Sequence, residues 1–225
     1  MATALTFAEL QRCDDTGDTA LLDRIADDLY RDGYCIVDNA LPEPMTQALF
    51  AYQKALSEQQ FSEAGIGRKS LFHKNESVRT DKVCWIDGSS QVGAQWLEWC
   101  NTLKTHLNKR LFMGLFSFES HFAHYQPGDF YKRHYDAFKG ASNRVLSLVT
   151  YLNKEWDALD GGELVLYKDD ADTAGVRVTP KLGTVVLFLS EEFPHEVRPA
   201  TRDRYSIAGW FRVNTTSGNR IDPPR

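Results

Sequence analysis

The sequence lacks several features that would place it in a special class of protein. Its four cysteines, Cys13, Cys35, Cys84 and Cys100, are widely spaced and form no CxxC pair, which argues against a zinc knuckle or a disulfide scaffold. No stretch approaches the roughly 18 consecutive apolar residues of a membrane span, and the N-terminus has no basic segment followed by an apolar run. We therefore expect reduced cysteines, a cytoplasmic location and no membrane partner.

An excess of basic residues is also missing. The chain has 26 Lys and Arg residues against 31 Asp and Glu, a net charge of -5, whereas nucleic-acid binding calls for a positively charged face. A nucleic-acid partner is therefore not expected. With 42% hydrophobic and 25% charged residues over 225 positions, the composition is that of one globular domain. The oligomeric state does not follow from the sequence.

Helical periodicity is confined to the first half of the chain. Apolar side chains recur at helical spacing in three segments, residues 19–32, 42–56 and 95–111. Short buried strands are expected at residues 34–37 and 83–86. Glycine, basic and polar residues dominate residues 62–82, a composition typical of a mobile loop. Such a loop either closes over a ligand or is an ordinary solvated connection.

After residue 113 the apolar pattern changes to the alternation that is typical of strands. Strands are expected at residues 120–125, 144–153, 163–168, 184–190 and 205–213. Many short strands separated by turn signals favour a sandwich or jelly roll over alternating β/α units. We therefore predict an α+β, mainly β fold. A double-stranded β-helix (jelly roll) spans residues 114–214, the helices, strands and loop of residues 1–113 pack on one of its sheets, and residues 215–225 form a flexible tail.

Three potential metal ligands stand out in the strand-rich half. His134 and Asp136 lie two positions apart, so an extended backbone directs both side chains to the same side. His195 follows the apolar segment 184–190, and a jelly roll can bring it back beside the first pair. Two histidines and one carboxylate on one face of an octahedral ion leave three positions open, as in non-haem iron(II) oxygenases. The sequence therefore predicts an iron site.

The open positions call for a second binding group. A 2-oxo acid can occupy two of them and O2 the third, but the distal carboxylate of the oxo acid then needs a fixed cation. Arg204 lies nine residues after His195 on a predicted strand, and a guanidinium can bind a carboxylate through two hydrogen bonds. Strand alternation places the small residues Ser206 and Ala208 beside Arg204. Trp210 lies on the same side and is expected to form a wall of the pocket.

Several stretches of the second half carry a resemblance to a known family. They are residues 79–88, 125–128, 131–136, 151–157, 161–164, 195–200 and 204–205. In this order they resemble the prolyl 4-hydroxylase family of 2-oxoglutarate oxygenases, especially the hypoxia-inducible-factor prolyl hydroxylases and their bacterial relatives. The likeness covers roughly residues 79–213. The segment that follows Asp136 and the residues before Arg79 depart from the pattern of the animal enzymes, which puts the substrate in doubt.

The resemblance implies roles for further residues. It implies that Arg204 binds the distal carboxylate of 2-oxoglutarate, which agrees with the role inferred from its position after His195. It also implies that Tyr151 donates a hydrogen bond to the same carboxylate. Tyr125 would lie near the chelating end of the same molecule. The loop that ends at Asp81 resembles the family's segment that folds over the substrate peptide, and Arg144 would lie opposite it. An Asp81–Arg144 ion pair that closes the entrance is therefore a hypothesis.

The activity implied by the resemblance is hydroxylation of a prolyl residue in a protein or peptide. Fe(II) would be the metal, 2-oxoglutarate and O2 the cosubstrates, succinate and CO2 the coproducts, and ascorbate a further candidate cofactor. Asp136 favours hydroxylation, because halogenating relatives lack this carboxylate. Two alternatives stay open: a 2-oxoglutarate hydroxylase of a free amino acid or another small molecule, and a catalytically silent metal-binding jelly roll. Nucleic-acid dealkylation is disfavoured by the acidic balance and by the wide spacing between Arg204 and Arg212.

Overall fold

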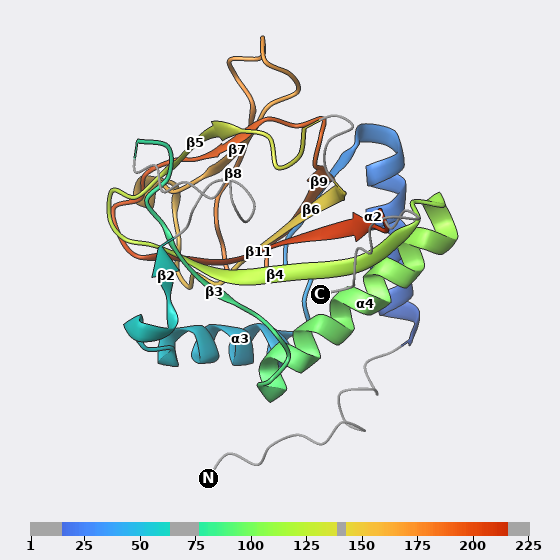
Figure 1. Cartoon of the computed structure of the whole chain (residues 1–225), viewed down its shortest axis with the longest axis horizontal. Helices are drawn as coiled ribbons and strands as arrows, with labels where there is room; N and C mark the ends of the chain where they lie inside the picture. The colour runs from blue at the N-terminus through green and yellow to red at the C-terminus, as the bar shows by residue number, and fades with distance from the viewer. Residues whose placement is uncertain (1–14, 64–76, 139–142, 216–225) are drawn as a thin grey trace.

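Two antiparallel sheets and three α-helices make up the part of the chain that the computed structural model describes (Figure 1). That part comprises residues 15–63, 77–138 and 143–215, with side chains from residue 19 onwards. The helices are α2 (Asp15–Asp32), α3 (Glu43–Ala55) and α4 (Gln91–Leu111). Two short 3-10 helices cover Glu58–Gln60 and Ala158–Asp160.

The larger sheet has seven strands in the order β1-β9-β6-β11-β4-β3-β2. Its strands are β1 (Tyr34–Val37), β2 (Ser62–Glu63), β3 (Lys82–Trp85), β4 (Leu115–Tyr125), β6 (Arg144–Tyr151), β9 (Val185–Leu189) and β11 (Arg204–Val213). The smaller sheet has the order β5-β10-β7-β8. Its strands are β5 (Tyr131–His134), β7 (Leu164–Leu166), β8 (Val176–Val178) and β10 (His195–Val197).

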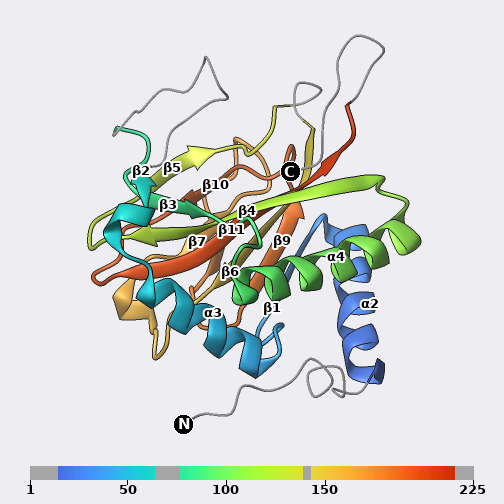
Figure 2. The same cartoon turned by 60° about the horizontal axis from the view of Figure 1, so that its bottom comes forward.

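The larger sheet is covered on both faces, and β9 shows how its sequence meets that requirement. Val185 and Leu187 belong to the core between this sheet and the helices, whereas Val186 and Phe188 belong to a second core between the two sheets. Successive side chains of a strand point to opposite faces, so a strand covered on both sides needs an unbroken apolar run. Figure 2 shows α3 and α4 on one side of the larger sheet and β5 and β10 on the other.

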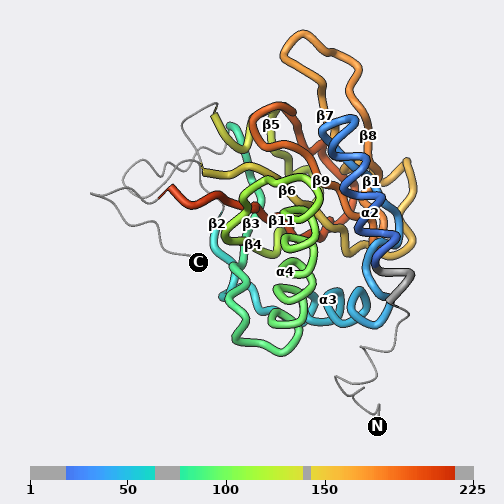
Figure 3. Tube along the Cα trace, turned by 90° about the vertical axis from the view of Figure 1, so that its right-hand side faces the viewer, coloured from blue at the N-terminus to red at the C-terminus, as the bar shows by residue number. Residues whose placement is uncertain are grey.

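The helices contribute the apolar faces that the sequence predicts. Ile25 of α2, Leu49 of α3 and Trp96 of α4 are all fully buried in the core that faces the larger sheet. The long connection between β7 and β8 instead projects from the body of the molecule (Figure 3, orange). No described helix is long and apolar enough to cross a membrane. The architecture is the mainly β fold that the sequence predicts, with the helices on one sheet.

Element boundaries differ from the sequence expectation where local side chains decide them. Helix α4 begins at Gln91, four residues before the predicted start, because the Ser90 hydroxyl caps it by accepting from the Gly93 amide at 3.0 Å. Strand β4 begins at Leu115 instead of residue 120. The short strands β2, β5, β8 and β10 are not separately predicted, since two to four residues carry too little alternation to recognise.

The structure describes both ends of the segment that the sequence predicts to be a mobile loop, residues 62–82. Its first two residues form β2, which pairs with β3 in the register Ser62↔Val83. Near its other end, the Thr80 amide donates to the Phe130 carbonyl at 3.2 Å. Residues 64–76 of this loop, and all but the first residue of the expected tail 215–225, lie outside the described residues.

Gly209, in the middle of β11, is closely packed against a neighbouring strand. A Cβ at this position would lie 2.5 Å from the Phe118 ring and 2.9 Å from the Glu119 carbonyl oxygen. Because β11 is paired on both sides, it cannot move away. We expect Gly209→Ala to lower the free energy of unfolding by about 2 kcal/mol, measured by urea denaturation. The loss should shrink in a Phe118→Leu background; an equal loss there would mean that the ring contact is not the cause.

Candidate metal and cosubstrate centre

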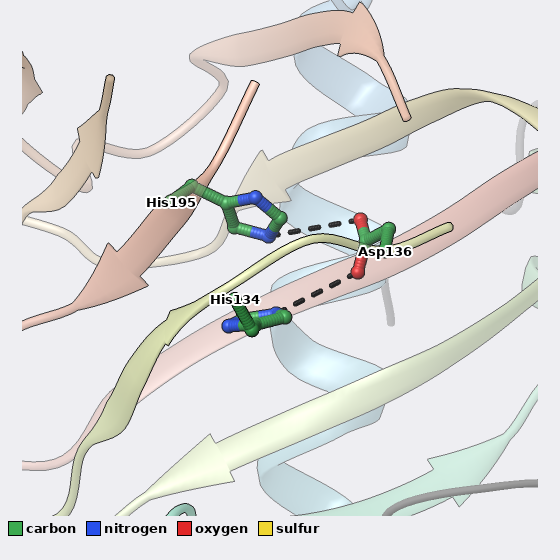
Figure 4. A group of neighbouring side chains, drawn as sticks. All are labelled: His134, Asp136 and His195. Carbon is green, nitrogen blue, oxygen red and sulfur yellow. Dashed lines mark ion pairs between the residues drawn. The ribbon is translucent and has the colours of Figure 1, made fainter. Parts of the chain in front are cut away.

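Strand pairing brings the three predicted ligands together. Strands β5 and β10 pair antiparallel with His195 directly opposite His134, and Asp136 follows two residues after His134. One ligand atom from each of the three side chains lies within 4.8 Å of the others. Figure 4 shows the two imidazole rings and the carboxylate turned toward one another. This is a set of two nitrogens and one oxygen that suits a divalent transition metal.

Backbone hydrogen bonds prepare both imidazoles for binding a metal. Nδ1 of His134 lies 2.7 Å from the Lys132 carbonyl oxygen, and Nδ1 of His195 lies 3.1 Å from that of Phe193. A carbonyl oxygen can only accept, so in each neutral ring the proton sits on Nδ1 and Nε2 keeps its lone pair. Both Nε2 atoms lie 3.6 Å from an oxygen of Asp136. The lone pairs therefore face the position where a metal would be bound.

The protonation states of the site also suit a metal. Burial alone would raise the pKa of Asp136, but His195, His134 and the hydrogen bond from Ser147 hold that pKa well below its usual range. Burial and the neighbouring His134 lower the pKa of His195 to about 4, so its ring is neutral at pH 7. The Ser147 hydroxyl donates to Asp136 at 2.6 Å and contacts the Ser190 hydroxyl at 2.9 Å. The carboxylate is thus ionised and oriented.

Arg204 is a buried cation whose contacts leave room for an anion. Its side chain is 1% exposed, Nε donates to the Gly162 carbonyl at 2.8 Å and Nη1 to the Ser206 hydroxyl at 3.2 Å. Among the described residues no carboxylate lies within ion-pair distance of it. A buried guanidinium that has no anionic partner is costly, so the protein would be stabilised by a carboxylate at this point. A bound anion fits that need.

Two tyrosines flank this guanidinium because of the sheet register. Tyr125 of β4 pairs with Arg204, and Tyr151 of β6 pairs with Ser206, so both rings lie about one strand away, 5.0 and 5.1 Å from the Arg204 Cζ atom. Among the described residues, the buried Tyr151 hydroxyl has no hydrogen-bond partner of good geometry, and Arg204 is its charged neighbour. Burial raises the pKa of Tyr151 to about 12 and the pKa of Tyr125 well above its usual value. Both hydroxyls therefore keep a proton that they can donate to a carboxylate.

The residues expected at the entrance have different partners from those expected. Asp81 accepts two hydrogen bonds from Arg79, at 2.8 and 2.6 Å, whereas Arg144 donates to Glu119 at 3.0 and 2.8 Å. The predicted Asp81–Arg144 ion pair is therefore not formed in this structure. Asp81 finds Arg79 only two residues away in the chain, whereas Arg144 meets Glu119 because β6 and β4 flank the same strand, β11.

Trp210 is buried and braced by charged and aromatic neighbours. The Arg144 guanidinium lies 3.6 Å from the centre of the Trp210 ring, and His121 lies on another side with its ring centroid 5.5 Å away. Sequence reasoning did not identify Ser147, Glu119 or His121. Their importance comes from strand register, which places them beside residues far away in the chain. The role of Trp210 as a wall of the substrate pocket stays a prediction.

Comparisons with known proteins agree on one superfamily. Residues 120–212 match the model of the 2OG-Fe(II) oxygenase superfamily. A crystal structure of a Pseudomonas putida prolyl-4-hydroxylase is 38% identical, with a TM-score of 0.75 over 86% of this chain and 98% of that chain. A prolyl hydroxylase from Trichoplax adhaerens, solved with a hypoxia inducible factor oxygen degradation domain peptide fragment, is 27% identical, with a TM-score of 0.74 over 93% and 94%. The predicted jelly-roll fold is thereby confirmed.

A curated human relative shows the same likeness over part of its length. Egl nine homolog 1 from Homo sapiens is 27% identical over 201 residues, which cover 84% of this chain and 46% of that protein. The chain spans about half the length of the first curated relatives that it matches.

The candidate ligands predict a measurable stabilisation by metal. We expect Mn²⁺, a redox-stable stand-in for Fe(II), to raise the melting temperature, because a ligand at 100 times its Kd adds about 2.7 kcal/mol to the unfolding free energy. The shift should vanish in His195→Ala. The matched control is His124→Ala, whose ring pairs with Asp203 at 2.7 Å outside the cluster, and which should keep the full shift. An unchanged shift in His195→Ala would contradict this ligand set.

Proposed function

Because the chain belongs to the prolyl 4-hydroxylase family within the 2OG-Fe(II) oxygenase superfamily, we propose that it hydroxylates a prolyl residue of a protein substrate. Fe(II) is the metal of this superfamily, and 2-oxoglutarate and O2 are the cosubstrates. The observation that carries the proposal is the buried Arg204, which lies beside the Tyr151 ring. Among the described residues, no carboxylate pairs with this guanidinium, and the Tyr151 hydroxyl has no hydrogen-bond partner of good geometry. A site that only bound metal would not need this pair.

Each part of the site has a defined task in this proposal. His134, Asp136 and His195 would hold the metal. When bound, Fe(II) supplies the redox chemistry by which O2 and 2-oxoglutarate are converted to succinate and CO2 while one oxygen atom enters a substrate C–H bond. Arg204 and Tyr151 bind the distal carboxylate of 2-oxoglutarate and so fix the orientation of its reacting end. Tyr125 lies beside the same molecule and excludes water.

The entrance residues support a polypeptide substrate. Trp210 offers an aromatic wall that Arg144 braces, and Trp85, with its ring 5.1 Å from that of His121, is 53% exposed. Exposed aromatic surface beside a reaction site is suited to an extended peptide. The Trichoplax adhaerens relative was solved with a peptide fragment, which favours a protein substrate here over a free amino acid or another small molecule. We also propose that the segment ending at Asp81 takes part in closure over this peptide; the Asp81 side chain itself is buried against Arg79 and holds that end of the segment in place.

A cytoplasmic location is part of the proposal. Its support is that Cys35, Cys84 and Cys100 are free thiols, and that burial raises the pKa of the Cys100 thiol well above its usual value. Such thiols suit a reducing compartment. Fractionation of cells that produce the full chain tests this, and recovery of the protein outside the cytosol would contradict it.

Loss of the guanidinium should separate cosubstrate binding from metal binding. In Arg204→Met we expect the visible band of the anaerobic Fe(II)–2-oxoglutarate complex and succinate formation to disappear, while Mn²⁺ still raises the melting temperature. Tyr151→Phe should raise the dissociation constant for 2-oxoglutarate about tenfold, because a hydrogen bond to a charged group contributes about 1.5 kcal/mol or more to binding. Arg202→Met removes an exposed guanidinium that lies 4.5 Å from the Trp156 ring and serves as the control. Succinate formation by Arg204→Met at the wild-type rate would contradict the proposed cosubstrate site.

The substrate class has its own test. Lysate proteins treated with the wild-type chain, Fe(II), 2-oxoglutarate and O2 should gain one oxygen atom on specific prolyl residues, detected by peptide mass spectrometry. Treatment with His134→Ala should give none of these modified peptides. Oxidised amino acids or other small molecules in the same lysate, without modified proteins, would favour the small-molecule alternative. Metal binding without any succinate formation would favour the silent module.

A further inference from the structure

Tyr131 contacts the candidate ligand His134 on one ring face and a guanidinium on the other. The ring centroids of Tyr131 and His134 lie 3.5 Å apart with an interplanar angle of 15°. The Cζ atom of Arg79 lies 4.3 Å from the Tyr131 centroid. One ring face has room for only one group at these distances, so the imidazole and the guanidinium cover opposite faces. The three side chains form one column.

Arg79, at the outer end of this column, is itself fixed. Its guanidinium donates to both carboxylate oxygens of Asp81, and the two side chains are 11% and 0% exposed. The surrounding backbone is joined to β5, because the Lys132 amide donates to the Val78 carbonyl at 2.9 Å and Arg79 bridges with Tyr131. Moving the cation off the ring would break a buried ion pair, which is costly.

The two candidate histidine ligands differ in how their rings are held. The His195 side chain is 7% exposed, and Phe188 packs against its ring with centroids 4.7 Å apart. The His134 side chain is 14% exposed and lies at the last position of β5. Its hydrogen bond to the Lys132 carbonyl still permits the ring to swing about that contact. The flat face of Tyr131 removes this freedom.

We propose that Tyr131 is a positioning residue that fixes the plane of the His134 imidazole for the metal, and that the Arg79–Asp81 ion pair holds Tyr131 in place. The inference rests on the proposed metal site and extends it to three residues that do not belong to the ligand set. Partners that orient a metal ligand commonly change metal affinity by 10- to 100-fold. Metal affinity therefore depends on Asp81, through the guanidinium and the tyrosine ring.

The test compares dissociation constants for Mn²⁺, measured by titration calorimetry on the full chain. Tyr131→Leu removes the flat ring and should raise the constant about tenfold, whereas Tyr131→Phe keeps the ring and should stay within about twofold. The matched control is Tyr205→Leu. Tyr205 stacks on His124 with centroids 4.7 Å apart and has Lys54 over its ring at 4.6 Å, the same kind of column away from the metal. This control should bind Mn²⁺ like the wild type.

A double-mutant cycle tests the outer part of the column. Asp81→Asn should weaken Mn²⁺ binding roughly threefold in the wild type and have no further effect in Tyr131→Leu, because its influence passes through the ring. Additive effects would overturn the role of the ion pair. If Tyr131→Leu does not fold, as judged by circular dichroism, Tyr131→Met takes its place, since its flexible side chain fills the volume without a flat face.

The outcomes for the inference and for the proposed function are distinct. Wild-type Mn²⁺ affinity in the Tyr131 variant that folds, with binding lost in His134→Ala, would overturn the inference and leave the metal site standing. Absence of Mn²⁺ binding in the wild-type chain, or unchanged binding in His134→Ala, would overturn the metal site and the inference together. The inference is supported if Mn²⁺ binding is weaker in Tyr131→Leu while Tyr131→Phe and Tyr205→Leu bind Mn²⁺ like the wild type.

Discussion

The antiparallel pairing of β5 with β10 is the contact on which the site depends. It places His195 opposite His134, and the two strands are only three and four residues long. Because side chains alternate along a strand, a shift of one residue would turn one imidazole away from the other. The flanking pairing of β10 with β7, with His195 opposite Leu166, and the apolar contacts of Val197 in the inter-sheet core hold that register.

The site also keeps two buried charges apart. Asp136 is ionised because the two histidines and a serine hydroxyl outweigh the effect of burial, and Arg204 is held by a carbonyl and a hydroxyl in place of an acid. Each charge is costly when buried alone and would be compensated by the opposite charge of the proposed ligand, a metal cation at one and a carboxylate at the other. Pairing the two with each other would satisfy both charges and remove the site.

The entrance shows how one sheet can serve stability and function together. Arg144 and Glu119 lie on β6 and β4, on either side of β11, and their ion pair crosses that strand beside Trp210, whose ring the Arg144 guanidinium contacts. On the opposite face of the same strand, Ile207 and Phe211 pack into the core under the helices. Residues that anchor β11 therefore also set the position of Arg204.

The sequence by itself determined the helices, the longer strands, the jelly-roll class and the residues His134, Asp136, His195 and Arg204, because each is encoded by local periodicity or by residue type at a fixed spacing. Only the tertiary structure decided the partners. Ser147 on Asp136 and Arg79 in place of Arg144 on Asp81 arise from strand register and from packing across residues distant in the chain. Such contacts leave no local pattern, because they depend on which strands meet, and that is settled by the burial of both cores as a whole.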